Sequence, residues 1–451
     1  MNQTAERKQS FPRSFWAANS IELFERAAYY AVASFVVIYL NEDLLMNPTF
    51  STFLNGTILW GMLYFLPILS GTLADKFGFR RSLMVSFVMI SIGYFIMGFV
   101  QEFWPALIGA PPGAPVDYTI PVLIGILFIG IGGSIVKPCI AGTVQKTAGT
   151  QARLGFAIFY MVINIGSISG RAVSYFIRTQ FGIPAIFTYV ATIFALLGFF
   201  IVIFIYKEPK YSEDPQKDEQ EIQKKTLGQA ILGIFKVLAN LKFLFFIVFT
   251  GLFWFVYLQI YNLVPLFLRS IDPEAPVELY TMANPFMIVA LQLLISRMVK
   301  KWTPIRSIIM GIGVLTVGML INIVPILLFT DFAQKVTFLG LGLPIAGIFM
   351  IGAIAAMAIG EMMASPRIFE YIGAIAPKGE EGLYLGYANL PIALGSFLSP
   401  IGGALFSYFI LNPQRGQSSD IILMWLIVSA FGIISMIGMA FYDKFIVKTK
   451  E

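Results

Sequence analysis

Long apolar stretches recur along this 451-residue chain, and they constrain its fold more than any other feature. A helix needs about 20 apolar residues to cross a bilayer, at roughly 1.5 Å per residue. The predicted spans are Phe15–Leu40, Phe53–Ala74, Ser82–Val100, Thr119–Val144, Leu154–Ile177, Ala185–Tyr206, Phe243–Leu268, Leu279–Val299, Ile305–Phe329, Pro344–Ile375, Leu383–Leu411 and Ile421–Phe445. Because only 12% of the residues are charged, we predict an all-α membrane protein with twelve transmembrane helices.

One strongly polar segment, residues 207–242, divides the twelve spans into six and six. We interpret it as a solvated cytoplasmic linker whose later part, Leu227–Leu238, forms an amphipathic helix at the membrane interface. The predicted domains are therefore six-helix bundles at 1–206 and 243–451. This plan resembles the major facilitator fold, in which substrate binds near the midplane between the bundles. No conformation is predicted for residues 331–343, which are apolar only in part and too short to span.

Lysine and arginine are concentrated in the loops that follow the second, fourth, eighth and last spans. The second span is followed by Lys76, Arg80 and Arg81, for example, whereas the opposite loops carry few basic residues. By the positive-inside rule, both termini are expected to be cytoplasmic. The short loops and the lack of a cleavable signal pattern favour a bacterial inner membrane. The net charge of +6 is then an orientation signal and no evidence for nucleic-acid binding.

The composition excludes several kinds of chemistry. The chain has no histidine, so imidazole can be neither a proton relay nor a metal ligand. A single cysteine, Cys139, excludes an intramolecular disulfide framework. No nucleophile–base set, metal cluster or phosphate-binding loop is recognisable, so we predict neither an enzyme nor a cofactor or metal site. Proton chemistry would have to use carboxylates.

The first span carries three charges within its apolar sequence. Glu22 and Arg26 are four residues apart, as are Arg26 and Tyr30, and also Glu25 and Tyr29. Each charge would cost about 2.5–3.5 kcal/mol in the membrane unless it faced protein or water and was compensated. We interpret the row of acid, guanidinium and phenol groups as a polar relay in a membrane cavity. The alternative is a helix that starts late, with its charges at the interface.

Other spans add further ionisable groups. Arg26 can bind a carboxylate through two parallel hydrogen bonds, and Lys137 in the fourth span supplies a point charge. Glu361, about halfway along the tenth span, places a buried acid in the other half of the chain. The alternatives are that Lys137 snorkels to the interface and that Glu361 neutralises a structural arginine. Arg171, a further cation in the fifth span, receives no predicted role.

The loop after the second span resembles a signature of the major facilitator superfamily. Its sequence runs Gly71-Thr-Leu-Ala-Asp75-Lys-Phe-Gly78-Phe-Arg-Arg81, and the signature is Gly-x-x-x-Asp-Arg/Lys-x-Gly-x-Arg-Arg. An ordinary positive-inside loop would explain the arginines but not Gly71, Asp75 and Gly78 together. The signature says nothing about the substrate.

Further motifs, one per span, resemble those of the proton-coupled oligopeptide transporters within that superfamily. They are Glu22-x-x-Glu25-Arg26-x-x-Tyr29-Tyr30, Tyr64-x-x-Pro67, Lys137-Pro-Cys139, Phe159-Tyr-x-x-Ile-Asn164-x-Gly-Ser167, Asn284-Pro285 and Gly360-Glu-Met-Met-Ala-Ser-Pro366, followed by Ala376-Pro377. The chain departs from the family at Ala27 and Cys139, and the seventh span lacks the acidic residue that many members use in an outer gate. The resemblance therefore indicates a divergent member.

The resemblance implies symport of di- or tripeptides with protons, by alternating access and without a cofactor. It implies the following roles: proton coupling by Glu22, Glu25 and Glu361; peptide-carboxylate binding by Arg26 and Lys137; peptide-amine binding by Glu361 and Asn284; and peptide-backbone binding by Tyr29, Tyr30, Tyr64 and Asn164. Glu22 and Glu25 would pair with Arg26 or Lys137 in the empty protein, and protonation would release the cation. Asn164 and Asn284 have an alternative role as interhelical hydrogen-bonding residues, and Tyr64 as a packing residue.

Two other functions stay open at this point. One is proton-coupled symport or antiport of a non-peptide zwitterionic or anionic solute. The other is a membrane sensor that binds a ligand without transporting it. In each case the expected partners are a small molecule and the lipid bilayer, and the protein is expected to be a monomer.

Overall fold

The computed structural model describes residues 10–209, 227–376 and 381–447 of the chain. Ten helical segments in this part are long and apolar enough to cross a membrane, and two bent helix pairs raise the number to as many as twelve. The prediction of an all-α integral membrane protein is therefore confirmed. Residues 210–226, in the middle of the predicted linker, lie outside the described residues, so the domain bounds stay a prediction.

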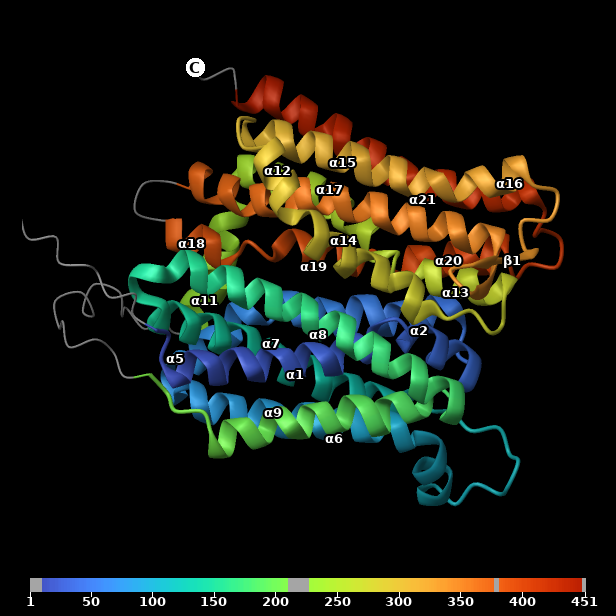
Figure 1. The fold of residues 1–451 in the computed structure, drawn as a ribbon, viewed down its shortest axis with the longest axis horizontal. Coiled ribbons are helices and arrows are strands. Elements are labelled where there is room, and N and C mark those ends of the chain that lie inside the picture. Colours follow the sequence, from blue (N-terminus) through green and yellow to red (C-terminus); the bar gives the residue numbers. More distant parts are fainter. Residues whose placement is uncertain (1–9, 210–226, 377–380, 448–451) are drawn as a thin grey trace, which may run out of the picture.

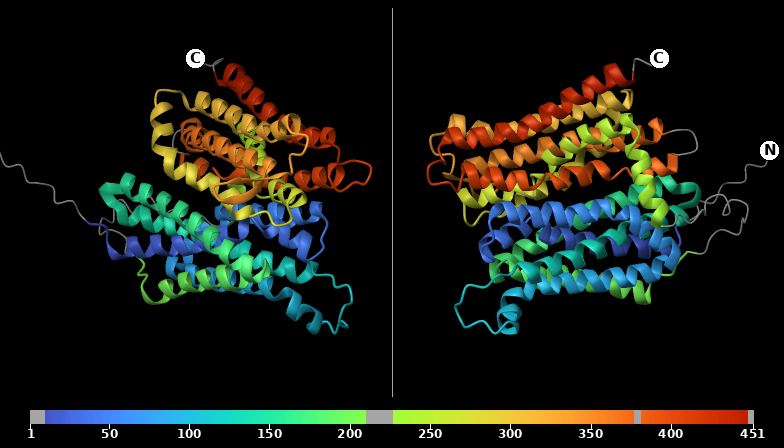
Figure 2. Two further views of the ribbon diagram at one scale, coloured as in Figure 1. Left: turned by 45° about the vertical axis from the view of Figure 1, so that its right-hand side comes forward. Right: turned by 180° about the vertical axis from the view of Figure 1, so that it is seen from behind.

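The helices form two groups that lie side by side in Figure 1 and in both views of Figure 2. The first group contains α1 (Arg13–Ala33), α2 (Val36–Ile38), η1 (Tyr39–Asp43), α3 (Pro48–Thr52), η2 (Phe53–Trp60), α4 (Gly61–Phe65), α5 (Pro67–Phe77), α6 (Phe79–Leu107), α7 (Thr119–Ala148), η3 (Gly149–Gln151), α8 (Ala152–Phe181), η4 (Ile186–Ala191) and α9 (Thr192–Phe204). The second contains α12 (Leu241–Leu258), α13 (Leu263–Ile271), α14 (Val277–Met298), α15 (Pro304–Leu320), η5 (Ile321–Ile323), α16 (Val324–Leu328), α17 (Ile345–Ile375), α18 (Glu381–Gly386), α19 (Leu390–Phe397), α20 (Pro400–Phe409), α21 (Ser418–Phe441) and η6 (Tyr442–Val447).

Helix α11 (Leu227–Leu238) connects the two groups in space, because it contacts both α5 and α12. Its bounds are those of the predicted interfacial helix, Leu227–Leu238. We call the end of the molecule at which α1 begins the proximal end, and the opposite end the distal end. In Figure 1, α5, α11 and α18 lie at the proximal end, and α13, α16 and β1 at the distal end.

The two groups are joined by polar contacts toward the distal end. Within the described residues these contacts are Ser34–Thr281 (2.7 Å between hydroxyls), Asn55–Asn262 (3.1 Å), Arg171–Thr281 (3.1 Å), Arg171–Tyr261 (3.2 Å), Arg178–Glu278 (2.9 Å), Glu42–Arg269 (2.5 Å) and Thr57–Phe397 (3.3 Å). They bring α1, η2 and α8 of the first group against the α12–α14 region and α19 of the second. The groups are therefore locked together at the distal end in this structure.

Two predicted spans are bent. The first consists of Arg13–Ala33 and Val36–Asp43, which meet at 41°, and the second of Pro48–Phe65 and Pro67–Ala74, which meet at 40°. Pro67 explains the second bend, because proline has no N–H to donate and its ring clashes with the preceding turn. The second span also begins earlier than predicted, at Pro48, where Asn47 caps the helix by accepting a hydrogen bond from the Phe50 N–H (2.8 Å).

The region without a predicted conformation, 331–343, contains most of a β-hairpin. Strand β1 (Lys335–Phe338) pairs in antiparallel fashion with β2 (Leu341–Pro344) through a two-residue turn. Leu339 and Gly340 both have positive φ (50° and 82°), as tight hairpin turns require. The Lys335 ammonium lies 2.8 Å from the Asp272 carboxylate, so the hairpin is fastened to the loop between α13 and α14.

Helices α15 and α17 approach each other closely at two glycines. A Cβ atom on Gly311 would lie 2.6 Å from the Gly360 carbonyl oxygen, and a Cβ atom on Gly360 would lie 2.6 Å from the Gly311 carbonyl oxygen. Small residues allow this approach, which is how membrane helices gain packing contacts.

We expect Gly311→Leu to destabilise the protein by about 1–3 kcal/mol or more, because the added side chain forces the two backbones apart. The control is Gly352→Leu on α17, where an added Cβ would meet nothing within 4 Å. Thermal unfolding of both variants in detergent measures the difference. A melting temperature that falls equally in both would contradict the tight α15–α17 contact.

Candidate functional site

The charged row predicted in the first span lies on α1, inside the first group. Glu22 is fully buried, and its Oε1 is 3.5 Å from the Arg26 Nε. The same Nε donates a hydrogen bond to Glu25. The guanidinium is therefore neutralised by two carboxylates, as expected for the empty site. Because α1 starts at Arg13 and both acids are buried, the alternative of a late-starting helix is wrong.

Lys137 contributes a second cation from α7. Its side chain is exposed, although α7 runs from Thr119 to Ala148 and Lys137 lies well inside it. Among the described residues, no carboxylate lies within 4.0 Å of its ammonium. Lys137 nevertheless interacts electrostatically with Glu22, Glu25 and Arg26. It is therefore a free, accessible cation beside the α1 cluster.

The second group presents an acid and an amide. Glu361 on α17 is half-buried, and its Oε2 accepts a hydrogen bond of 3.0 Å from the Asn284 Nδ2 on α14. Asn284 in turn accepts a hydrogen bond of 3.5 Å from the Tyr257 hydroxyl on α12. In the described part of the chain no lysine or arginine lies within 4.0 Å of Glu361, so it does not neutralise a structural arginine. Asn284 does join two helices, as its alternative role predicts.

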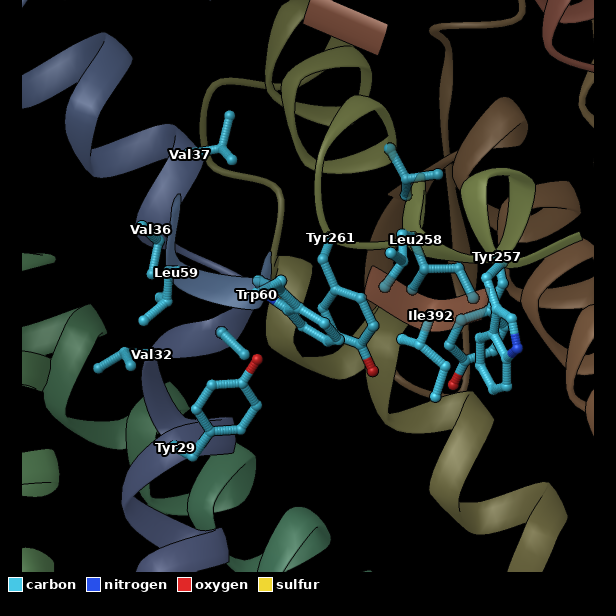
Figure 3. Close-up of a cluster of buried hydrophobic side chains, with 14 of the residues drawn as sticks. Tyr29, Val32, Val36, Val37, Leu59, Trp60, Tyr257, Leu258, Tyr261 and Ile392 are labelled. Carbon is cyan, nitrogen blue, oxygen red and sulfur yellow. The ribbon is translucent and has the colours of Figure 1, made fainter. Parts of the chain in front are cut away.

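An aromatic cluster lies between the two groups. The Trp60 ring is 5.6 Å from Tyr29, 5.8 Å from Tyr64 and 4.9 Å from Tyr261. Figure 3 shows Trp60 beside Tyr261 of the second group, with Tyr29 of α1 below them. Tyr29 and Tyr64 were predicted to be site residues, whereas Trp60 and Tyr261 were not. Trp60 and Tyr64 are four residues apart and therefore share one helix face, and this spacing could have identified Trp60 as a site residue.

The remaining predicted residues are Asn164 and Tyr30. Asn164 on α8 donates to the Tyr160 carbonyl of its own helix (2.9 Å), so this bond does not join two helices. Tyrosines from both groups interact electrostatically with Glu361, and these are Tyr30, Tyr64, Tyr160, Tyr257 and Tyr261. The structure thus brings residues from α1, α4, α8, α12 and the turn after α12 around one acid on α17. Tyr160 and Tyr257 were missed as site residues, although both stand in the segments that the sequence analysis considered.

A buried ion pair that the sequence analysis missed joins the groups at the distal end. Arg178 Nε donates to Glu278 Oε1 at 2.9 Å, and the two side chains are 7% and 0% exposed. Arg178 lies in the last turn of α8 and Glu278 in the first turn of α14. Each charge therefore sits at the helix end whose dipole favours it.

Some predictions concern residues outside this region. Arg367 pairs with Glu370 at 2.6 Å, three residues apart on α17. The Asp75 side chain and Pro377 lie outside the described residues. Among the described residues, no cluster of three or more histidine, cysteine, aspartate or glutamate side chains is suited to a metal.

The geometry suits a small zwitterion. Arg26 and Lys137 of the first group offer cations, and Glu361 with Asn284 of the second group offers an acid and an amide. A carboxylate and an ammonium on one solute would find opposite charges on the two sides. A ligand held in this way would contact both groups of helices at once.

Comparison with known proteins gives matches that cover most of the chain. The family model of the Major Facilitator Superfamily matches residues 20–356. A Bacillus subtilis protein described as an uncharacterized MFS-type transporter, YttB, is 26% identical over 391 residues, or 84% of this chain and 83% of the relative.

Two shorter matches each cover less than half of the chain. Solute carrier family 15 member 1 of Oryctolagus cuniculus is 27% identical over 210 residues, 42% of this chain and 29% of the relative. Dipeptide and tripeptide permease A of Cronobacter turicensis is 26% identical over 194 residues, 42% of this chain and 36% of the relative. The chain therefore matches only about a third of the length of these two relatives.

Solved structures match the fold along nearly the whole chain. A POT family transporter in complex with 5-aminolevulinic acid superposes with a TM-score of 0.69 at 18% identity, covering 96% of this chain and 97% of the other. A tetrameric PepTSo2 structure gives a TM-score of 0.69 at 18% identity, covering 97% and 98%. The predicted arrangement of helices in two bundles is thereby confirmed.

Proposed function

The chain belongs to the Major Facilitator Superfamily, and from this premise we propose that it is a proton-coupled symporter of di- and tripeptides. One observation carries the proposal. Glu361 is held by Asn284, has no lysine or arginine within 4.0 Å among the described residues, and shares two neighbours with Arg26, because Tyr30 and Tyr64 interact electrostatically with both groups. A zwitterionic peptide would bridge the two groups, with its carboxylate at the cations and its ammonium at Glu361. The shorter match to a dipeptide and tripeptide permease supports the same substrate class.

Proton coupling would use the α1 cluster. In the empty site, Glu22 and Glu25 occupy the Arg26 guanidinium. Protonation of one acid would weaken its hold on Arg26, because a neutral carboxyl loses the charge-assisted part of the hydrogen bond. The released guanidinium could then bind the peptide carboxylate. Proton binding and peptide binding would favour each other, as symport requires.

The distribution of basic residues supports an orientation with the proximal end in the cytoplasm. The junction of α5 and α6, with Lys76, Arg80 and Arg81, lies at that end, and the positive-inside rule assigns such basic clusters to the cytoplasmic side. The locked distal end would then face outward, and this conformation would be open only toward the cytoplasm. We further propose a monomer in a bacterial inner membrane, driven by the proton gradient without a cofactor.

Uptake into proteoliposomes under an imposed inward proton gradient tests the proposed function. We expect radiolabelled glycylglycine to accumulate, and unlabelled di- and tripeptides to compete more than single amino acids do. Protein-free vesicles and an uncoupler are the controls. Proton movement without dipeptide uptake would contradict the peptide assignment and leave a non-peptide solute. If neither protons nor peptides moved, the transporter assignment itself would be wrong.

A further inference from the structure

A buried cation without a carboxylate lies at the distal contact. Arg171 on α8 is fully buried, and its guanidinium carbon is 4.7 Å from the centre of the Tyr30 ring. Its Nη1 donates to Ser167 of its own helix. Its Nε donates to the Thr281 Oγ1 (3.1 Å) and its Nη2 to the Tyr261 hydroxyl (3.2 Å), both in the second group. No carboxylate lies within 4.0 Å of Arg171 among the described residues.

This charge balance sets Arg171 apart from two other arginines nearby. Arg26 is paired with two acids, and Arg178, two turns further along α8, is paired with Glu278. Four hydrogen bonds join Arg171 to neutral oxygens, but they leave its charge without a counter-ion among the described residues. A buried charge is costly unless it is paired, and an ionisable residue inside a membrane protein commonly marks the path of a substrate.

The positions of its partners indicate when a counter-ion would bind. Nε and Nη2 form the edge of a guanidinium that holds a carboxylate through two parallel hydrogen bonds. In this structure, hydroxyls of the second group occupy that edge. If the two groups separate at the distal end, Thr281 and Tyr261 move away with the second group. Ser167 and Tyr30 stay with Arg171 and keep it in place, with its binding edge free toward the distal opening.

We propose that Arg171 is the first binding point for the substrate carboxylate in the distally open state. On closure, Thr281 and Tyr261 replace the carboxylate, which passes to Arg26 and Lys137. Tyr30 lies one turn after Arg26 on α1, and its ring contacts the Arg171 guanidinium, so it adjoins both the first cation and the second. This inference rests on the proposed function and extends it: the ligand is a small solute with a free carboxylate, and Arg171 selects for that group.

A labelling experiment tests the carboxylate site without any transport. Ser399, fully buried, lies against Gly56 of the first group and is not one of the residues bonded to Arg171, so Ser399→Cys reports opening of the distal contact. A membrane-impermeant maleimide is applied at the distal side with acetate or with acetamide. The unmodified chain, whose single cysteine Cys139 is buried, gives the background rate.

We expect acetate to raise the alkylation rate several-fold over acetamide in the Ser399→Cys protein, because it binds Arg171 only when the distal end is open. The effect should disappear when Arg171→Gln is added. An equal response to acetate with and without Arg171, or no response in either protein, would overturn the proposal.

A transport experiment separates substrate selection from a structural role. Arg171→Gln should raise the KM for external glycylglycine by about ten- to hundredfold, the usual loss for a charge-assisted pair, and leave the KM for glycylglycine amide nearly unchanged. Arg171→Lys should restore only part of the preference, because an ammonium cannot form the two parallel bonds. The matched control is Arg178→Gln, which removes a buried guanidinium from the same helix and should alter both substrates equally.

If Arg171→Gln changed both substrates by the same factor, as Arg178→Gln does, Arg171 would serve only to hold the closed distal contact, and the proposal would be wrong. Failure of the wild-type protein to carry any dipeptide would contradict the proposed function instead. In that case the acetate labelling still decides whether Arg171 binds a carboxylate.

Discussion

In a Glu22→Gln protein, gradient-driven dipeptide uptake should fall to the level measured without a gradient, while exchange of labelled for unlabelled dipeptide continues. Glu22 is fully buried next to Arg26, and neither of its carboxylate oxygens has a hydrogen-bond partner among the described residues. A glutamine there cannot take up or release a proton, but it resembles the protonated acid in shape. Binding and conformational exchange should therefore survive, and only the coupling to protons should be lost.

The measurement compares two assays on the same vesicles: accumulation under a proton gradient and counterflow without one. The control is Glu370→Gln, because Glu370 forms a half-exposed pair with Arg367 and such pairs contribute little. Undiminished accumulation by Glu22→Gln would exclude Glu22 as the coupling acid. Loss of counterflow as well would indicate a damaged binding site and would contradict the separation of coupling from binding.

The second large effect is expected at the opposite side of the site. Glu361→Gln should raise the KM for glycylglycine by about ten- to hundredfold, because a substrate ammonium would lose its only charged partner there. Glu361 has an amide partner, Asn284, and no cation within 4.0 Å in the described part of the chain. The preference for glycylglycine over its N-acetylated form should fall by the same factor, since acetylation removes the positive charge.

Thermal unfolding distinguishes this effect from misfolding. A half-buried carboxylate without a nearby cation destabilises the folded state. The Glu361→Gln protein should therefore unfold at the same temperature as the wild type or at a higher one. An unchanged preference for the free amine would show that Glu361 does not bind it. A marked loss of thermal stability would indicate that Glu361 has a structural role.

The sequence predicted much of the fold correctly, because the deciding signals are local. A run of apolar residues must be helical in a bilayer, where every backbone polar group has to be paired within the helix. The interfacial helix was predicted with its observed bounds, Leu227–Leu238, from its amphipathic pattern. The bend in the first span and the hairpin at 335–344 were not predicted. The hairpin is short, and an ion pair to Asp272, more than 60 residues earlier, holds it.

The candidate site was predictable to the extent that its residues interact along one helix. Glu22 and Arg26 are four residues apart, so their contact follows from helix geometry alone. Arg178 and Glu278 lie 100 residues apart, and neither stood out in the sequence because each lies near the end of its span. Trp60 and Tyr261 were missed for a different reason. An aromatic residue in an apolar span looks the same in the sequence whether its side chain packs in a core or lines a site.

By itself, the sequence determined where the helices lie along the chain, which of them carry charges, and which acids and cations are available, because hydrophobic length and residue spacing are properties of the chain. Only the tertiary structure decided what each charged group contacts: Arg26 contacts two acids, Glu361 an amide, and Arg171 hydroxyl groups and a backbone carbonyl. The physical reason is that the energy of a buried charge depends on the few atoms within hydrogen-bonding distance. For Arg171, the two that can be replaced come from residues 90 and 110 positions away, in the other group of helices.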